Sequence, residues 1–146
     1  MKLFIKKLNE NAIVPKQATT GSAGYDLSAC IEHAITIQPN EIVKIPTGIS
    51  VAFEEKNAVI LIYARSSLAT KFGISLVNSV GVVDSDYRGE IIVALSNFGK
   101  EPYTIEPNER IAQMVITPIF TPTVEVVQTL SETERGNGGF GSTGKK

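Results

Sequence analysis

A two-residue alternation of apolar and polar side chains is the feature that most constrains the fold of this chain. It is clearest over residues 43–53, which predict one long, half-buried strand that is bulged or at a sheet edge because it contains Pro46. Shorter runs that favour strands recur at 3–7, 25–31, 34–37, 58–63, 75–78, 81–84, 90–97, 103–105, 110–120 and 123–127. Many short strands separated by turn residues predict an all-β sandwich or barrel.

One segment, 66–72, predicts a short helix instead. Ser66 and Ser67 offer hydroxyls for its N-cap, helix formers follow, and Gly73 suits its C-cap. Arg65 precedes it directly. Because a helix start carries free N–H groups and partial positive charge, Arg65, Ser66 and Ser67 form a candidate phosphate site, although capping explains the serines about equally well.

The composition is that of an ordinary globular chain of one domain, with 146 residues, 42% apolar residues and a net charge of −1. A net charge so close to zero does not indicate the excess of positive charge that is typical of proteins that bind nucleic acid. The longest uncharged apolar run, 58–64, is far too short for a membrane span, and lysines interrupt the first apolar residues before a signal-peptide core accumulates. The one cysteine, Cys30, excludes an intrachain disulfide and favours a cytoplasmic setting, and the lone His33 is not expected to bind metal.

The C-terminus is rich in glycine, with five of the twelve glycines in its last eleven residues. One interpretation is a disordered tail. The other is a clasp on a phosphorylated ligand, because the segment offers unshielded backbone N–H groups, an arginine, hydroxyls and one aromatic ring. A phosphate-binding P-loop is excluded, since Lys146 stands where Ser or Thr is required and the following helix is missing.

A polar loop between two strand-forming runs is the second candidate site. Residues 78–93 predict a β-hairpin with Asp84 at the end of its first strand and Tyr87 in its loop. An EF-hand is excluded because Arg88 occupies the third ligand position. The alternative to a functional role is that Asp84 and Asp86 only hydrogen-bond the backbone of the turn.

Five ordered segments together resemble the motifs of the trimeric dUTPase family, and the resemblance extends from about residue 2 to 144. The segments are AGYDLSA (23–29), ARSSLA (64–69), GVVDSDYRG (81–89), ERIAQM (109–114) and RGNGGFGSTG (135–144). The resemblance implies a jelly-roll β fold of residues 1–130 that assembles as a homotrimer. It also implies that residues 131–146 form a flexible arm that closes over a neighbouring subunit's site.

The reaction that the resemblance implies is hydrolysis of dUTP to dUMP and pyrophosphate, which keeps dUTP low and supplies dUMP for thymidylate synthesis. Asp84 would be the general base that activates water for attack on the α-phosphorus. Tyr87 would lie against the deoxyribose and exclude a 2′-hydroxyl. The groups expected to bind uracil are those of Asn78, Gly81, Val82, Val83 and Ile92.

The phosphates would be bound, by the same resemblance, at the helix start and by the arm. The residues implied are Arg65, Ser66, Ser67, Gln113, Arg135, Gly141, Ser142 and Thr143, with Phe140 stacking over the uracil. Mg²⁺ would bridge the triphosphate oxygens, and Asp26 would hold it through water. The alternative for Asp26 is a pair with Arg65 or with a backbone amide.

The sequence departs from the family pattern at two positions, and two alternative functions are considered. Phe72 replaces a frequent histidine and Val80 a frequent proline, and both changes are expected to affect packing only. A dCTP deaminase shares the fold but is disfavoured by the Asp84–Tyr87 loop. A binding module without catalysis is disfavoured because Asp84, Tyr87, Arg135 and Phe140 are all present.

Overall fold

The computed structural model describes residues 1–139, and its architecture is the predicted all-β fold with one short helix. Over that range the elements are, in order, β1 (Leu3–Lys7), β2 (Tyr25–Ser28), β3 (Ile35–Ile37), β4 (Ile42–Pro46), β5 (Ile49–Phe53), β6 (Ala58–Ala64), α1 (Ser66–Phe72), β7 (Ile74–Leu76), β8 (Gly81–Val83), β9 (Ile92–Asn97), β10 (Tyr103–Ile105) and β11 (Arg110–Pro118).

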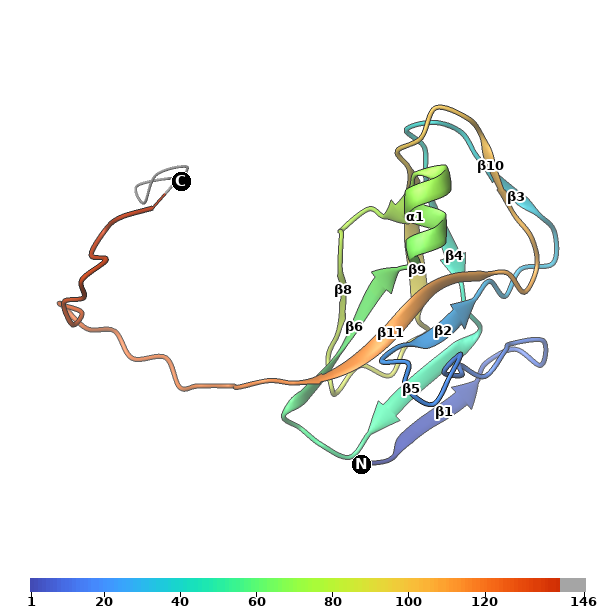
Figure 1. The fold of residues 1–146 in the computed structure, drawn as a ribbon. Coiled ribbons are helices and arrows are strands. Elements are labelled where there is room, and N and C mark those ends of the chain that lie inside the picture. The colour runs from blue at the N-terminus through green and yellow to red at the C-terminus, as the bar shows by residue number, and fades with distance from the viewer. Residues whose placement is uncertain (140–146) are drawn as a thin grey trace.

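The strands pair antiparallel and mostly with partners that are distant in sequence (Figure 1). One sheet has the order β2-β11-β6-β8 and another the order β4-β9-β7, while β1-β5 and β10-β3 form two-stranded ribbons. The largest pairing joins β6 to β11, with Ala64 opposite Ala112 and Ala58 opposite Pro118. Crossovers of this kind are typical of jelly rolls.

The core lies between these sheets and draws one side chain or more from nearly every strand. Its fully buried members include Leu27, Ile37, Ile45, Ile60, Leu95, Ile105 and Met114. Each such side chain contributes roughly 1.5–3 kcal/mol by leaving water. The predicted alternation thus identified the inward-facing positions of the strands.

The predicted long strand 43–53 is wrong, because the chain turns between β4 and β5. Gly48 has a φ of 69°, which favours glycine, and a Cβ there would lie 2.7 Å from Cys30 Sγ and 2.8 Å from Ala12 Cβ. The alternating pattern continues through Pro46 and Thr47, so it does not reveal this turn. The break lets β4 pair with β9 while β5 pairs with β1.

The predicted β-hairpin over 78–93 is also wrong. β8 pairs with β6, whereas β9 pairs with β4 and β7, so the two runs lie in different sheets. Residues 84–91 therefore connect two sheets. The expected strand over 123–127 is not formed either.

The helix is confirmed, but its start is not capped as predicted. Its N-cap residue is Arg65, and no side chain caps the first turn in the described part of the chain. Gly73 ends the helix in the left-handed conformation, with its N–H donating to the last turn. Only Leu68 of the helix is buried, while Phe72 packs on Tyr103 with ring centroids 4.9 Å apart.

Residues 119–139 leave the body after β11 and run away from it (Figure 1). They carry exposed apolar side chains, among them Phe120, which is 98% exposed, and Val126, which is 96% exposed. Among residues 1–139, no helix has the length and apolar character needed to cross a membrane.

Candidate active site

A cavity of about 230 Å³ lies beside β8 and the loop that follows it. It is lined by Ile62, Val82, Val83, Asp84, Tyr87, Glu90, Ile91 and Ile92. Five of the residues predicted for base, sugar or catalysis therefore meet here, although the hairpin expected to join them does not exist. Ile62, Glu90 and Ile91 were not predicted.

The backbone beside this cavity belongs to a sheet edge. β8 is the last strand of its sheet and pairs only with β6 within the described residues. Gly81 lies opposite Ile62, and a Cβ on Gly81 would be 3.1 Å from the Ile62 Cβ, so the glycine lets β8 pack closely on β6. The free edge of β8 leaves backbone donors and acceptors available to a ligand.

Asp84 lies at the end of β8 with an exposed side chain. Its backbone carbonyl accepts the Tyr87 N–H at 3.1 Å, which closes a turn. Within residues 1–139, the carboxylates of Asp84 and Asp86 accept no hydrogen bond, so the alternative in which they stabilise the turn is not supported. Arg88 stabilises the loop instead, since one guanidinium nitrogen donates to the carbonyls of Ser85 and Tyr87.

Tyr87 folds back over the loop toward the cavity. Its hydroxyl donates to the Glu90 carbonyl at 3.0 Å, and its ring lies against Gly89, where a Cβ would come within 2.6 Å of the ring atom Cζ. Tyr87 nevertheless remains 46% exposed. Gly89 is thus required for the position of the tyrosine ring.

Three side-chain hydrogen bonds tie the end of the loop to the turn between β4 and β5. The Thr47 hydroxyl donates to the Ile91 carbonyl at 2.6 Å, and the Ser50 hydroxyl donates to the Arg88 carbonyl at 2.7 Å. The Gly48 N–H donates to Glu90 Oε1 at 2.7 Å. These bonds fix the loop that carries Asp84 and Tyr87.

A second cluster of predicted residues lies where β6 runs into α1. Asp26 Oδ1 is 3.2 Å from Arg65 Nε, and Asp26 Oδ2 accepts a hydrogen bond from Arg110 Nη1 at 2.9 Å. Gln113 Nε2 donates to the Ala64 carbonyl at 3.1 Å, and the exposed Ser66 and Ser67 follow Arg65. Both oxygens of Asp26 thus contact arginines; the contact with Arg65 is the alternative considered for this residue, and the contact with Arg110 was not predicted.

Arg110 belongs to this cluster without having been given a role. Its carbonyl accepts a hydrogen bond from Arg65 Nη1 at 3.2 Å, so the two arginines and Asp26 form one network. The only sequence signal was its place in the ERIAQM segment.

Asp84 and Arg65 lie at opposite ends of β6. Val83 is opposite Ile60, so Asp84 falls level with Val59, which lines a shared surface hollow with it. Arg65 follows the other end of the same strand. Six residues of strand separate them, or about 20 Å at the usual rise per residue. One chain therefore does not bring Asp84 and Arg65 to the same phosphate group.

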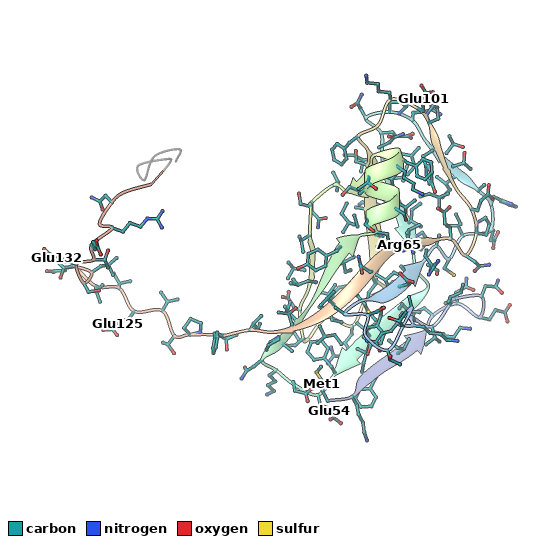
Figure 2. All side chains as sticks on the ribbon, viewed as in Figure 1. Met1, Glu54, Arg65, Glu101, Glu125 and Glu132 are labelled. Atoms are coloured by element: carbon teal, nitrogen blue, oxygen red, sulfur yellow. The ribbon has the colours of Figure 1, made fainter. Side chains whose placement is uncertain are left out.

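The remaining predicted residues lie elsewhere. Asn78 is exposed, and its carbonyl accepts the Val80 N–H at 2.7 Å. Arg135 Nε donates to the Gly138 carbonyl within the segment that leaves the body, where Figure 2 shows the nearby Glu132 far from Arg65. Phe140, Gly141, Ser142 and Thr143 lie outside the described residues.

Two side chains have shifted pKa values. Burial, then the hydrogen bond and the negative charge of Glu109, raise the pKa of Tyr103. Burial, then the negative charge of Glu90, raise the pKa of the Cys30 thiol, partly offset by Lys7. A raised pKa leaves less of the Cys30 thiol as the nucleophilic thiolate at neutral pH.

The described residues contain no group of three or more His, Cys, Asp or Glu side chains that could hold a metal ion. Asp26 is the carboxylate nearest to the predicted phosphate-binding residues, and it is held by Arg65 and Arg110.

Comparison with known proteins gives consistent matches. The family model described as dUTPase matches residues 10–144. A deoxyuridine 5′-triphosphate nucleotidohydrolase of Desulfitobacterium hafniense is 50% identical over 131 residues, which cover 90% of this chain and 87% of the relative.

Two solved structures have the same fold. A mutant dUTPase of Staphylococcus bacteriophage 80alpha, bound to dUpNHpp, superposes with a TM-score of 0.89 at 29% identity and covers 98% of both chains. A mutant dUTPase of phage phi11 of S. aureus, described with a structural Mg(II) ion, has a TM-score of 0.81 at 23% identity over 90% of this chain and all of the other.

Proposed function

The chain belongs to the dUTPase family, and on this premise we propose how its residues hydrolyse dUTP to dUMP and pyrophosphate. Uracil and deoxyribose occupy the cavity beside β8, the phosphates reach the Asp26–Arg65–Arg110 cluster of another copy, and Asp84 activates the attacking water. The observation that carries the proposal is the separation of about 20 Å between Asp84 and Arg65 along β6.

The cavity supports binding of the base and the sugar. The free edge of β8 exposes the peptide N–H and C=O groups of alternate residues along Gly81–Val83, and a uracil edge carries donors and acceptors that can pair with them. Ile92 and Ile62 supply apolar walls. The Tyr87 ring lies at the rim against Gly89, where it takes the space that a 2′-hydroxyl needs. The slot would be too tight for the methyl group of thymine, and the donor pattern of cytosine would leave buried groups unpaired.

Asp84 is suited to activate water. Its carboxylate is exposed at the cavity, and the described residues leave its oxygens free of hydrogen bonds. It would take the proton from a water molecule that lies in line with the leaving pyrophosphate. Positioning and charge neutralisation account for the remaining rate, as is general for transfer at phosphorus.

Charge neutralisation would come from the second cluster. Arg65 and Arg110 present guanidinium groups whose geometry suits phosphate oxygens, and Ser66, Ser67 and Gln113 lie beside them. Because Arg65 lies about 20 Å from Asp84 on one chain, a homotrimer with sites between subunits satisfies both halves of the nucleotide. Each trimer would then hold three sites.

The C-terminal arm and a magnesium ion complete the proposal. Arg135, together with Phe140, Gly141, Ser142 and Thr143, would close over the nucleotide bound by a neighbouring copy, and residues 131–146 would order only at that step. Magnesium, when bound, neutralises the triphosphate charge, with Asp26 as its nearest carboxylate. A cytoplasmic setting, expected from the sequence, stays a prediction.

The test uses two inactive variants that should restore each other. Asp84→Asn should lower the rate of pyrophosphate release from dUTP by roughly 10²- to 10⁴-fold while the protein still binds dUpNHpp. Arg65→Ala should weaken binding and turnover. When the two variants are refolded together in equal amounts, about a quarter of the sites should combine an intact Asp84 with an intact Arg65 from a second chain.

Recovery of activity toward that fraction supports a shared site. Activity that stays at the level of the separate variants, in a mixture shown by labelling to have exchanged subunits, would contradict it. Ammonia release from dCTP, instead of pyrophosphate from dUTP, would point to a deaminase.

A further inference from the structure

Glu90 makes two hydrogen bonds that connect Tyr87 to the body of the fold. Its backbone carbonyl accepts the Tyr87 hydroxyl at 3.0 Å, and its carboxylate oxygen Oε1 accepts the Gly48 N–H at 2.7 Å. One residue therefore links the exposed ring at the rim of the cavity with the turn between β4 and β5.

The turn at the other end of this link has little freedom to move. Gly48 is buried with a φ of 69°, and the space where its Cβ would lie is filled by Cys30 Sγ and Ala12 Cβ. The adjacent residue Thr47 is 1% exposed and donates its hydroxyl to the Ile91 carbonyl, and the Ile91 N–H donates to the Ile49 carbonyl. Ile91, which follows Glu90, is thus held in place by these two hydrogen bonds.

The loop between Asp84 and Glu90 is less constrained. Asp84, Asp86, Tyr87 and Arg88 are all exposed. Without its hydroxyl bond and the contact with Gly89, the side chain would be free to visit other staggered χ1 rotamers. The position of the ring therefore depends on where the Glu90 backbone is held.

We propose that Glu90 is a positioning residue that holds Tyr87 at the rim of the cavity and thereby sets the preference for deoxyribose over ribose. The inference rests on the proposed role of Tyr87. The Glu90 carboxylate acts through the Gly48 N–H, which fixes the Glu90 backbone. The Glu90 carbonyl in turn fixes the ring that fills the space of a 2′-hydroxyl. Glu90 itself touches no reacting atom in this arrangement.

The hydrogen bond between the Gly48 N–H and the Glu90 side chain predicts which substitutions of Glu90 retain the connection to Tyr87. Glutamine retains an oxygen at the position of Oε1, so Glu90→Gln should still accept the Gly48 N–H. Alanine leaves that buried N–H without its partner and releases the loop. Glu41 offers a matched control, because its carboxylate also accepts a backbone N–H, that of Gln38 at 2.8 Å, in a turn before β4 that lies outside the cavity lining.

The test is the ratio of kcat/KM for dUTP to kcat/KM for UTP, measured on the full chain for the wild type and for Tyr87→Ala, Glu90→Ala, Glu90→Gln and Glu41→Ala. Glu90→Ala should lower the ratio by roughly 5- to 10-fold, in the direction of Tyr87→Ala, as expected for a lost hydrogen bond. Glu90→Gln should restore it, and Glu41→Ala should leave it unchanged.

The outcomes separate this inference from the function on which it rests. If Tyr87→Ala lowers the ratio and Glu90→Ala does not, the link through Glu90 is refuted while the role of Tyr87 stands. If Tyr87→Ala leaves the ratio intact, the role of Tyr87 fails and this inference fails with it. Should Glu90→Ala not fold, Tyr87→Phe breaks the same link at its other end, and an unchanged ratio in that variant refutes it.

Discussion

Replacing Asp26 by asparagine should lower the stability of the fold and weaken phosphate binding, because one carboxylate contacts two arginines. Its oxygens face Arg65 Nε at 3.2 Å and Arg110 Nη1 at 2.9 Å. An asparagine side chain keeps one oxygen acceptor, and its NH₂ group would face a second donor. At least one arginine must therefore lose its partner.

The magnitude follows from the exposure of each partner. The side chain of Asp26 is 19% exposed and that of Arg65 24%, so this partly buried ion pair should contribute about 1 kcal/mol, the upper value for exposed pairs. Arg110 is 53% exposed, which brings its contribution down to the surface value of about 0.5–1 kcal/mol. Asp26→Asn should thus lower the free energy of unfolding by about 0.5–2 kcal/mol, from the loss of the weaker contact alone to the loss of both.

Urea unfolding at one fixed protein concentration measures this change, since the stability of an oligomer depends on concentration. The same variant should raise the KM for dUTP by roughly 10-fold at saturating Mg²⁺, because the arginines lose their orientation. A free-energy loss below about 0.5 kcal/mol would refute the reasoning from the ion pairs. An effect on KM that disappears at high Mg²⁺ would instead identify Asp26 as a metal-binding residue.

Two further predictions concern the structure around the site. Asn97→Ala should lower the free energy of unfolding in urea by about 3 kcal/mol, because its fully buried amide group hydrogen-bonds the Ile37 carbonyl, the Glu101 carbonyl and the Gly99 N–H. The exposed Asn11→Ala is the control, and an equally small change in both variants would contradict the prediction. Tyr103 has a pKa raised above its ordinary value of 10.0, so its contribution to stability is full below pH 10 and is lost as the pH rises toward the folded-state pKa. The free energy of unfolding of Tyr103→Phe should therefore fall less steeply above pH 10 than that of the wild type, and parallel curves would show that the fold does not favour the neutral phenol.

The strands could be predicted where alternation and burial coincide. Ile49, Val51 and Phe53 face the core as the period of two requires, and Gly73 ends the helix as predicted. The turn at Gly48 was missed because a single glycine does not interrupt the pattern, and its left-handed conformation depends on contacts with Cys30 and Ala12. Such tertiary contacts leave no local signal.

Some residues of the candidate site could be predicted from the sequence and others could not. Asp84 and Tyr87 were predicted because their motif is distinctive, and both line the cavity. Glu90 was missed because its function depends on the Gly48 N–H, 42 residues away in the sequence. The pairing of Asp26 with Arg65 was foreseen only as an alternative and its pairing with Arg110 was missed, since sequence spacing does not show which strands are neighbours.

The strand pairing that makes the hairpin prediction wrong also leaves the β8 edge free for the proposed ligand. Had β8 paired with β9, the edge of β8 would be closed and no peptide groups would remain for a base. Instead β9 pairs on both sides with β4 and β7, and the bonds from Thr47, Gly48 and Ser50 hold the connecting loop away from that edge. An open edge is normally a site for unwanted strand pairing, but β8 has only three residues, too few to recruit a foreign strand stably. The fold thus keeps this short edge free for a ligand that brings its own hydrogen-bonding groups.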